Sequence, residues 1–295
     1  MCGIIGVFND CDASKKVINA LWAMRERGRD NLGIASSDSI SIKKQIDDLV
    51  PIAGNTIIGQ NLHSVVDNVA QPIRKKGSKG TLGINCEIYN WKELKDRYAL
   101  ASKNDAELVF DILELKGTDN LGKTLDEFDG VYAFSYWIGT KLILARDIVG
   151  VKPLWFMHDI KLGNFAFASE RKALYSVGFK DVQELNPRKI LEYDFSENTM
   201  KSFTRKYFTL GNNIRHSRHR PKKNEDNNEE YDTEEYDMKI DRTDSNTQKD
   251  NLKIREKTKD LLFKAIEKRL PDKEFGILFS GGIDSVFIAY VAKKL

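Results

Sequence analysis

A long polar tract is the feature that most constrains how this chain can fold. From about residue 211, NNIRHSRHRPKK is basic, and NEDNNEEYDTEEYDMKIDRTDSNTQKD is acidic with few larger apolar residues. Such a stretch buries too little apolar surface to offset the entropy of ordering it. We therefore predict a folded domain over residues 2–207, a disordered linker over 208–250, and the start of a second domain over 251–295.

Two histidines lie in the basic part of this tract. His216 and His219 stand among arginines without further ligands nearby, so they predict no metal site. The basic cluster over 215–223 leaves contact with a polyanion open as an alternative to a plain linker.

Charge and cysteine content exclude several classes of protein. The net charge is only +3 with 31% charged residues, so we expect neither a nucleic-acid nor a membrane partner. The opening CGIIGVF is too short for a signal peptide, and no run of apolar residues is long enough to span a bilayer. Cys2, Cys11 and Cys86 are few and odd in number, which predicts a reduced, cytoplasmic protein.

The first domain alternates helical and strand-like patterns. Val17, Leu21 and Met24 predict an amphipathic helix over 13–26, and AELVFDILELKG predicts a second helix that ends at Gly117. Strand-like runs are CGIIGVF, NTIIG, GTLGINCEIY, VYAFSYW, KLILAR, NFAFAS and KILEYDF. Many strands with few helices favour an α+β fold in which two sheets are layered between helices.

Regular patterning returns after the polar tract. LKIREKTKDLLFKAIEKRL has the apolar spacing of a helix, FGILF reads as a strand, and VFIAYVAKKL reads as another helix. The turn SGGIDS stands between the predicted strand and the last helix.

This turn has the composition of a phosphate-binding loop. Its glycines, Gly281 and Gly282, let backbone N–H groups approach an anion at a helix N-terminus. The hydroxyls of Ser280 and Ser285 add donors, and Asp284 could hold a magnesium ion bound to phosphate. An ordinary tight turn that caps the helix is the alternative. The string resembles the pyrophosphate loop of the ATP-pyrophosphatase family and lacks the Gly-Lys-Ser/Thr ending of a Walker A loop.

Cys2 directly follows the start methionine. If Met1 is removed, one residue supplies both a thiol nucleophile and, in its α-amino group, a candidate base. An incidental cysteine on a first strand is the alternative interpretation.

The neighbouring motifs favour the nucleophile. MCGIIGVF, RGRDNLG, NCEIYN, NDAELV, FDGVYAFSYW, RDIVGVKPL and ASERKAL occur in this order. Together they resemble the amino-terminal domain of class II glutamine amidotransferases, and SGGIDS narrows the resemblance to the asparagine synthetase family, particularly its archaeal-type members. The resemblance covers residues 2–207 and 252–295. It implies an N-terminal-nucleophile hydrolase fold, a four-layer αββα sandwich, followed by the start of an α/β ATP-pyrophosphatase domain.

The resemblance also implies roles for individual residues. Cys2 would attack the side-chain amide of glutamine, while the Asn85 side chain and the Cys86 backbone N–H would form an oxyanion hole. Glu87 and Asp105 match the positions that hold the α-amino group of glutamine. Without the family, a capped turn at Asn85 and solvated carboxylates at Glu87 and Asp105 would be the plainer interpretations.

Three departures from the family pattern stand out. Cys86 replaces a glycine, so its backbone would be strained if the position requires a positive φ. Leu62 aligns with the arginine that holds the α-carboxylate of glutamine, and the neighbouring His63 is expected to point to the opposite face of its strand. The family's synthetase domain also continues well beyond SGGIDS, so we expect ATP, Mg²⁺ and aspartate to be used only with a second polypeptide that carries the rest.

Two other functions remain open beside glutamine-dependent asparagine synthesis. A degenerate, non-catalytic regulatory or binding module would account for Leu62, Cys86 and the short second domain. Another class II amidotransferase, acting on a phosphoribosyl or sugar phosphate, gives SGGIDS no role. The resemblance is also compatible with a homodimer.

Overall fold

The computed structural model describes residues 1–64, 67–205, 245–271 and 274–295. The chain divides into two units, Met1–Thr209 and Leu210–Leu295. His216 and His219, the 215–223 cluster and most of the predicted linker lie outside the described residues.

The first unit contains a seven-stranded sheet with the order β10-β8-β9-β1-β4-β2-β3. All of its pairs are antiparallel, and β1 lies between β9 and β4. Its strands are β1 (Gly3–Phe8), β2 (Asn31–Ala35), β3 (Ile40–Lys43), β4 (Ile57–Leu62), β8 (Trp155–Asp159), β9 (Asn164–Ala168) and β10 (Gln183–Glu184).

A five-stranded sheet with the order β12-β11-β7-β6-β5 is also antiparallel throughout. Its strands are β5 (Gly80–Ile88), β6 (Gly130–Ile138), β7 (Lys141–Arg146), β11 (Lys189–Asp194) and β12 (Thr199–Thr204). The helical elements of this unit are α1 (Ala13–Ala23), η1 (Arg25–Arg27), η2 (Ile46–Asp48), α2 (Trp91–Arg97), α3 (Asp105–Lys116), α4 (Leu121–Leu125) and α5 (Arg171–Ser176).

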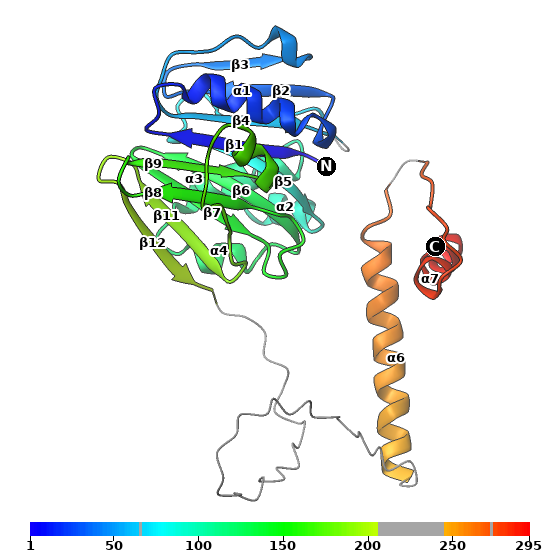
Figure 1. Ribbon diagram of the computed structural model, residues 1–295. Helices are drawn as coiled ribbons and strands as arrows, with labels where there is room; N and C mark the ends of the chain where they lie inside the picture. Colours follow the sequence, from blue (N-terminus) through cyan, green and yellow to red (C-terminus); the bar gives the residue numbers. More distant parts are fainter. Residues whose placement is uncertain (65–66, 206–244, 272–273) are drawn as a thin grey trace, which may run out of the picture. The chain divides into compact units, whose positions relative to one another are not determined.

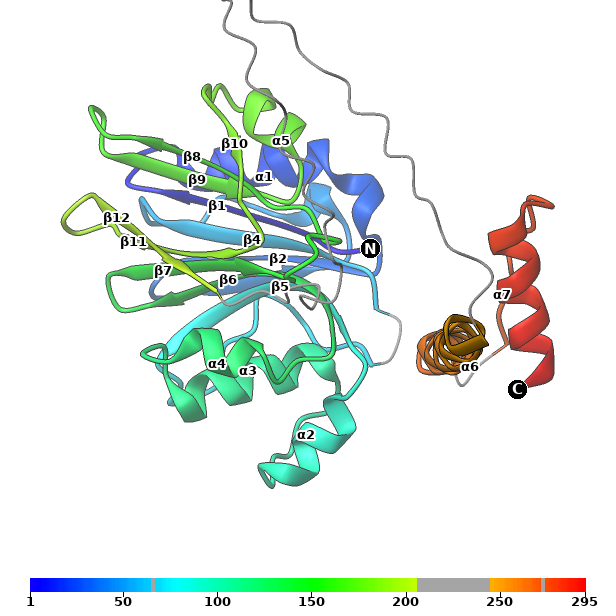
Figure 2. The ribbon, with the colours of Figure 1, turned by 90° about the horizontal axis from the view of Figure 1, so that it is seen from below.

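These elements form four layers (Figures 1 and 2). Helices α1 and α5 pack on the seven-stranded sheet, and α3 packs on β5 of the other sheet beside α2. The two sheets face each other, with β5 against β1 and β4. The α+β sandwich predicted for this part of the chain is therefore confirmed as an architecture.

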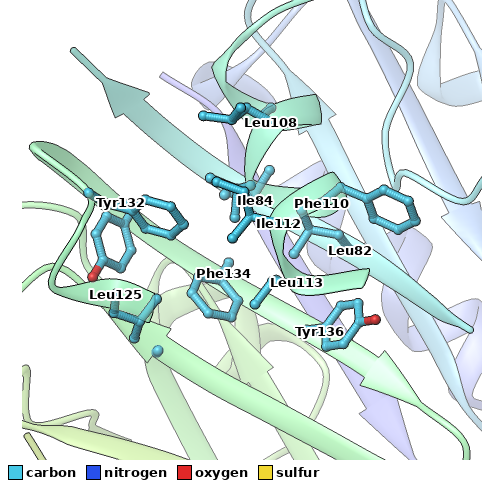
Figure 3. Packing of buried hydrophobic residues seen from close by; sticks show 14 of the residues in the cluster. Leu82, Ile84, Leu108, Phe110, Ile112, Leu113, Leu125, Tyr132, Phe134 and Tyr136 are labelled. Atoms are coloured by element: carbon cyan, nitrogen blue, oxygen red, sulfur yellow. The ribbon is translucent and has the colours of Figure 1, made fainter. Parts of the chain in front are cut away.

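Three apolar cores correspond to the three contacts between layers. Alternation along β1 places Ile5 and Val7 in the core under α1, and Ile4 and Phe8 in the core between the sheets. The third core, between the five-stranded sheet and α3, is drawn in Figure 3. It includes Leu82, Ile84, Leu108, Phe110, Ile112, Leu113, Leu125, Tyr132, Phe134 and Tyr136.

Local signals explain both predicted helices. The α1 helix ends at Ala23, after which η1 makes a tighter turn, so the helix is shorter than the predicted 13–26. The α3 helix is capped by Asn104, whose side chain accepts the Glu107 N–H at 2.9 Å. It ends where predicted, because Gly117 adopts φ 69°, a conformation that glycine tolerates best.

The second unit contains α6 (Ser245–Glu267) and α7 (Ile283–Lys294). Helix α6 begins within the predicted linker. The predicted strand FGILF is wrong, because residues 274–280 have no strand structure and Leu278 is 98% exposed. A strand requires a hydrogen-bonded neighbour, and no strand partner exists in this unit among its described residues. In the described parts of the chain, no helix is long and apolar enough to cross a membrane.

Candidate active site

Cys2 lies just before β1, at the edge where the two sheets meet. Its side chain is buried, and its backbone N–H donates to Oδ1 of Asn85 on β5 at 3.3 Å. The Cys2 sulfur lies 3.5 Å from the carbonyl oxygen of His63 and 3.4 Å from the His63 backbone nitrogen. Nε of Arg27 donates to the Cys2 carbonyl oxygen at 2.9 Å. Three segments that are distant in sequence therefore fix the position of this residue.

Asn85 has a buried donor that nothing uses. Its Oδ1 accepts from Cys2, while its Nδ2 is buried with no hydrogen-bond partner. An unpaired buried N–H group is costly, so such groups are rare unless a ligand completes them. The side-chain amide of Asn85 is thus held beside Cys2 with one donor free.

Cys86 points away from this pair. Side chains alternate along β5, so Cys86 shares the α3 side of the sheet with Ile84 and Ile88, and its thiol donates to Oδ2 of Asp105 at 3.6 Å. It pairs with Tyr132 in regular register and is absent from the residues with positive φ. The strain considered for this position therefore does not arise, because the backbone is ordinary extended strand.

Glu87 belongs to β5, and Asp105 approaches the same strand from α3. Asp105, the first residue of α3, accepts the backbone N–H of Ile88 at 3.0 Å. Glu87 pairs with Lys152, a residue for which the sequence predicted no role. Nζ of Lys152 lies 2.7 Å from Glu87 Oε1. Lys152 belongs to the RDIVGVKPL motif, but a single lysine in a loop gives no local signal of such a contact.

His63 contacts Cys2 in a way that strict alternation along β4 does not predict. Leu62 is the last residue of β4 and is buried. His63 lies beyond the end of the strand, so its backbone turns toward the Cys2 sulfur while its imidazole stays half exposed, 3.7 Å from Asp30. The histidine contributes main-chain contacts to the site, and its side chain lies at the rim.

Burial is the largest influence on the pKa of the Cys2 thiol. It raises the pKa of the Cys2 thiol, and the hydrogen bond from His63, the terminal amine and Lys152 oppose that rise. Burial likewise lowers the pKa of the Met1 amine. A thiol in this setting is mostly protonated at neutral pH and needs a nearby base to react.

The SGGIDS stretch spans the start of α7, since its first three residues precede the helix and its last three are the first helical residues. Gly281 has φ 78°, Gly282 occupies the N-cap position, and the hydroxyls of Ser280 and Ser285 are 3.1 Å apart. Asp284 lies in the first turn of the helix. The predicted loop before a helix is thus present, although the strand that was expected to precede it is not.

Other candidate sites are few among the described residues. No group of three or more histidine, cysteine, aspartate or glutamate side chains is arranged to hold a metal ion there. A cleft of about 570 Å³ lies between α4 and the outer face of β7, β11 and β12, and its lining contains neither cysteine nor histidine.

The fold and this arrangement define a class of protein. The model of the glutamine amidotransferase domain family matches residues 1–218. Phosphoribosylpyrophosphate amidotransferase from Bacillus subtilis has the same fold, with a TM-score of 0.60 over 69% of this chain and 49% of its own, at 22% identity.

Curated relatives indicate which members of the glutamine amidotransferase family this chain resembles. Asparagine synthetase B of Escherichia coli is 28% identical over 307 residues, covering 100% of this chain and 45% of its own. An amidophosphoribosyltransferase of Methanocaldococcus jannaschii is 29% identical over 222 residues, covering 65% of this chain and 47% of its own. The chain belongs to the glutamine amidotransferase family, as an asparagine synthetase-like class II member. It spans less than half of the length of these curated relatives.

Proposed function

We propose that this chain hydrolyses glutamine at Cys2 and supplies the released ammonia to an ATP-dependent amidation of aspartate. The observation that supports the first half is the buried, unpaired Nδ2 of Asn85, a side chain whose Oδ1 accepts the backbone N–H of Cys2. A donor fixed in advance where negative charge develops stabilises a tetrahedral intermediate without reorganising.

The first step uses the processed terminus. After removal of Met1, the Cys2 thiol gives its proton to the new α-amino group and its sulfur attacks the amide carbon of glutamine. The carbonyl oxygen becomes an oxyanion that takes the Nδ2 donor of Asn85 and the backbone N–H of Cys86. The α-ammonium then returns the proton to the departing nitrogen, ammonia leaves, and a thioester remains. Water hydrolyses the thioester to glutamate and restores the thiol.

Fixed surroundings support this chemistry. Arg27 holds the Cys2 carbonyl, and the backbone of His63 holds the sulfur on its other side. Asp105 and Glu87 supply the negative charge that an α-ammonium group requires. The hydrogen bond that the Cys2 nitrogen donates to Asn85 Oδ1 would orient the α-amino group once Met1 is gone.

The second half of the proposal concerns ATP. The backbone N–H groups of 281–283 and the hydroxyls of Ser280 and Ser285 suit a pyrophosphate at the start of α7. The carboxylate of Asp284 is the hard oxygen ligand that Mg²⁺ prefers, so the donor set fits a magnesium-bound phosphate. The E. coli asparagine synthetase aligns over the whole of this chain, whereas the amidophosphoribosyltransferase covers 65% of it. That difference favours aspartate over a phosphoribosyl acceptor.

The experiment for the first half is glutamine hydrolysis by purified protein beside Cys2→Ala. Intact mass must show that Met1 is absent. Glutamate release that Cys2→Ala abolishes supports the proposal. A processed protein that releases no glutamate and gains no thermal stability from glutamine supports the degenerate, non-catalytic module instead.

The experiment for the second half is asparagine formation with a partner. We propose that amidation also uses the parts of the asparagine synthetase relatives that this sequence does not span. The protein is assayed with a polypeptide that supplies those parts, and ATP- and aspartate-dependent asparagine formation is measured with Asp284→Ala as the comparison. No asparagine formation from an active glutaminase, in the presence of that partner, would contradict this half alone.

A further inference from the structure

The substrate of the proposed glutaminase carries both charges on its α-carbon. The site described so far offers two carboxylates for the α-ammonium group, on Glu87 and Asp105. An α-carboxylate placed near them is repelled unless a cation lies close by. Leu62 supplies none, because its buried side chain is apolar.

Two basic side chains near Cys2 already have other partners. Arg27 donates Nε to the Cys2 carbonyl and Nη1 to Glu170 at 3.1 Å, so a carboxylate already balances its charge. The imidazole of His63 is 52% exposed and lies beside Asp30 at the rim, where solvent weakens any interaction with a substrate charge.

Lys152 differs from both in burial and in its partner. Its side chain is only 5% exposed, and its ammonium pairs with Glu87, whose side chain is 54% exposed. The backbone of Lys152 is anchored, because the carboxylate of Asp147 accepts the N–H groups of Val151 at 2.9 Å and Lys152 at 3.0 Å. The cation is therefore held in place, while the carboxylate that pairs with it can turn into solvent.

Lys152 also lies within electrostatic reach of the nucleophile. The charge of Lys152 lowers the pKa of the Cys2 thiol, against the larger rise caused by burial. The same charge lowers the pKa of the Met1 amine. Glu87 is two residues from Asn85 on the same face of β5, so the Lys152–Glu87 pair and the free amide of Asn85 belong to one surface.

We propose that Lys152 binds the α-carboxylate of glutamine in the place of the missing arginine, and that the substrate separates Lys152 from Glu87. The substrate carboxylate takes over the buried ammonium, and Glu87 turns to the substrate ammonium. The buried ammonium of Lys152 keeps a partner throughout, which avoids the cost of an unpaired buried cation. This inference rests on the proposed function.

The test pairs a variant with an altered substrate. Lys152→Met keeps the length of the side chain and leaves only the exposed Glu87 unpaired, so the protein should fold. With glutamine, it should lower kcat/KM by about 10- to 100-fold, mainly through KM, as expected for a lost charge-assisted contact. With glutamine α-amide, which has no α-carboxylate, Lys152→Met and wild type should have equal kcat/KM.

Two controls keep the interpretation clear. Lys141→Met removes another Lys–Glu pair, Nζ to Glu192 Oε1 at 3.0 Å, far along β7, and should leave both substrates unaffected. Lys152→Arg keeps the charge and should recover part of the affinity for glutamine only. An equal loss on both substrates for Lys152→Met would overturn the assignment, because it would mean that the lysine acts on Cys2 or on the fold.

Measurements of glutamine binding distinguish a failure of this inference from a failure of the proposed function. Calorimetry of glutamine with Cys2→Ala, and with Cys2→Ala combined with Lys152→Met, needs no turnover. Binding that the second variant loses supports the role of Lys152 even without hydrolysis. If both variants bind glutamine equally, the assignment fails and the proposed function stands; if neither they nor the wild type bind it, the proposed function itself fails.

Discussion

The thiol of Cys86 lies 3.6 Å from Oδ2 of Asp105, on the face of β5 opposite to Asn85. Neighbouring residues of one strand thus belong to different environments, one in the layer under α3 and one beside Cys2. Under the proposed function, the Cys86 side chain therefore does not obstruct the backbone N–H that would stabilise the oxyanion.

Cys86→Gly should for this reason affect stability more than catalysis. Glycine in a strand interior and the loss of a partly buried thiol together should cost about 1–2 kcal/mol, while kcat for glutamine stays within about threefold of wild type. Thermal unfolding and steady-state kinetics measure both quantities. A large fall in kcat without a fall in Tm would mean that Cys86 contributes its side chain to the reaction.

Asn85→Ala should give the opposite result. Losing one oxyanion donor should lower kcat by about 100- to 1,000-fold. Tm should fall only modestly, because Nδ2 already lacks a partner and the bond lost is the one that Oδ1 accepts from the Cys2 N–H. Asn61→Ala is a matched control, since that buried amide donates to the carbonyls of Leu21 and Met24. It should lower stability by about 1–3 kcal/mol without a comparable loss of kcat.

Asp105→Asn should uncouple substrate binding from stability. Burial raises the pKa of Asp105, so the ionised carboxylate destabilises the fold, and the native state gains stability as pH falls through that raised pKa. The neutral variant should match or exceed the wild-type Tm at pH 7, lose this gain on acidification, and raise KM for glutamine about tenfold or more. Tm measured from pH 4 to pH 7 tests the sign, and a marked drop at pH 7 contradicts it.

Alkylation by iodoacetamide should reveal the protonated thiol in protein that retains Met1. Because burial raises the pKa of Cys2, thiolate should be scarce at neutral pH, and labelling should still increase between about pH 8 and about pH 10. Peptide mass spectrometry compares Cys2 with the exposed Cys11, which should react faster at pH 7. Faster labelling of Cys2 at pH 7 would show that its thiol is already activated without processing.

Strong periodicity made much of the first unit predictable. The helix α3 follows from apolar spacing between Asn104 and Gly117, and β1 and β5 follow from buried apolar runs. The edge strand β12 carried no such pattern: every one of its residues is exposed, so it has no alternation to recognise. The FGILF run gave the opposite error, because a strand was predicted there and none is present. Apolar composition alone cannot supply the neighbouring strand that the backbone of a strand requires.

The site was predictable only where a motif placed it. Cys2 and Asn85 are 83 residues apart and meet through the packing of two sheets, which no local pattern contains. Lys152 was missed because its partner, Glu87, is 65 residues away. The position of His63 depends on β4 ending one residue earlier, so strict alternation could not predict that its backbone would contact the Cys2 sulfur.

Cys2 is buried while Met1 is 63% exposed, and the peptide nitrogen of Cys2, which joins the two residues, already donates a hydrogen bond to Asn85. In the folded protein, the bond that an aminopeptidase would cut is therefore anchored at its far side. The timing of maturation follows: we expect Met1 to leave the growing chain before the two sheets close, and folded protein that retains it to stay unprocessed when incubated with the peptidase. If the protein is synthesised faster than Met1 is removed, the preparation would then contain a correctly folded fraction that never acquires activity.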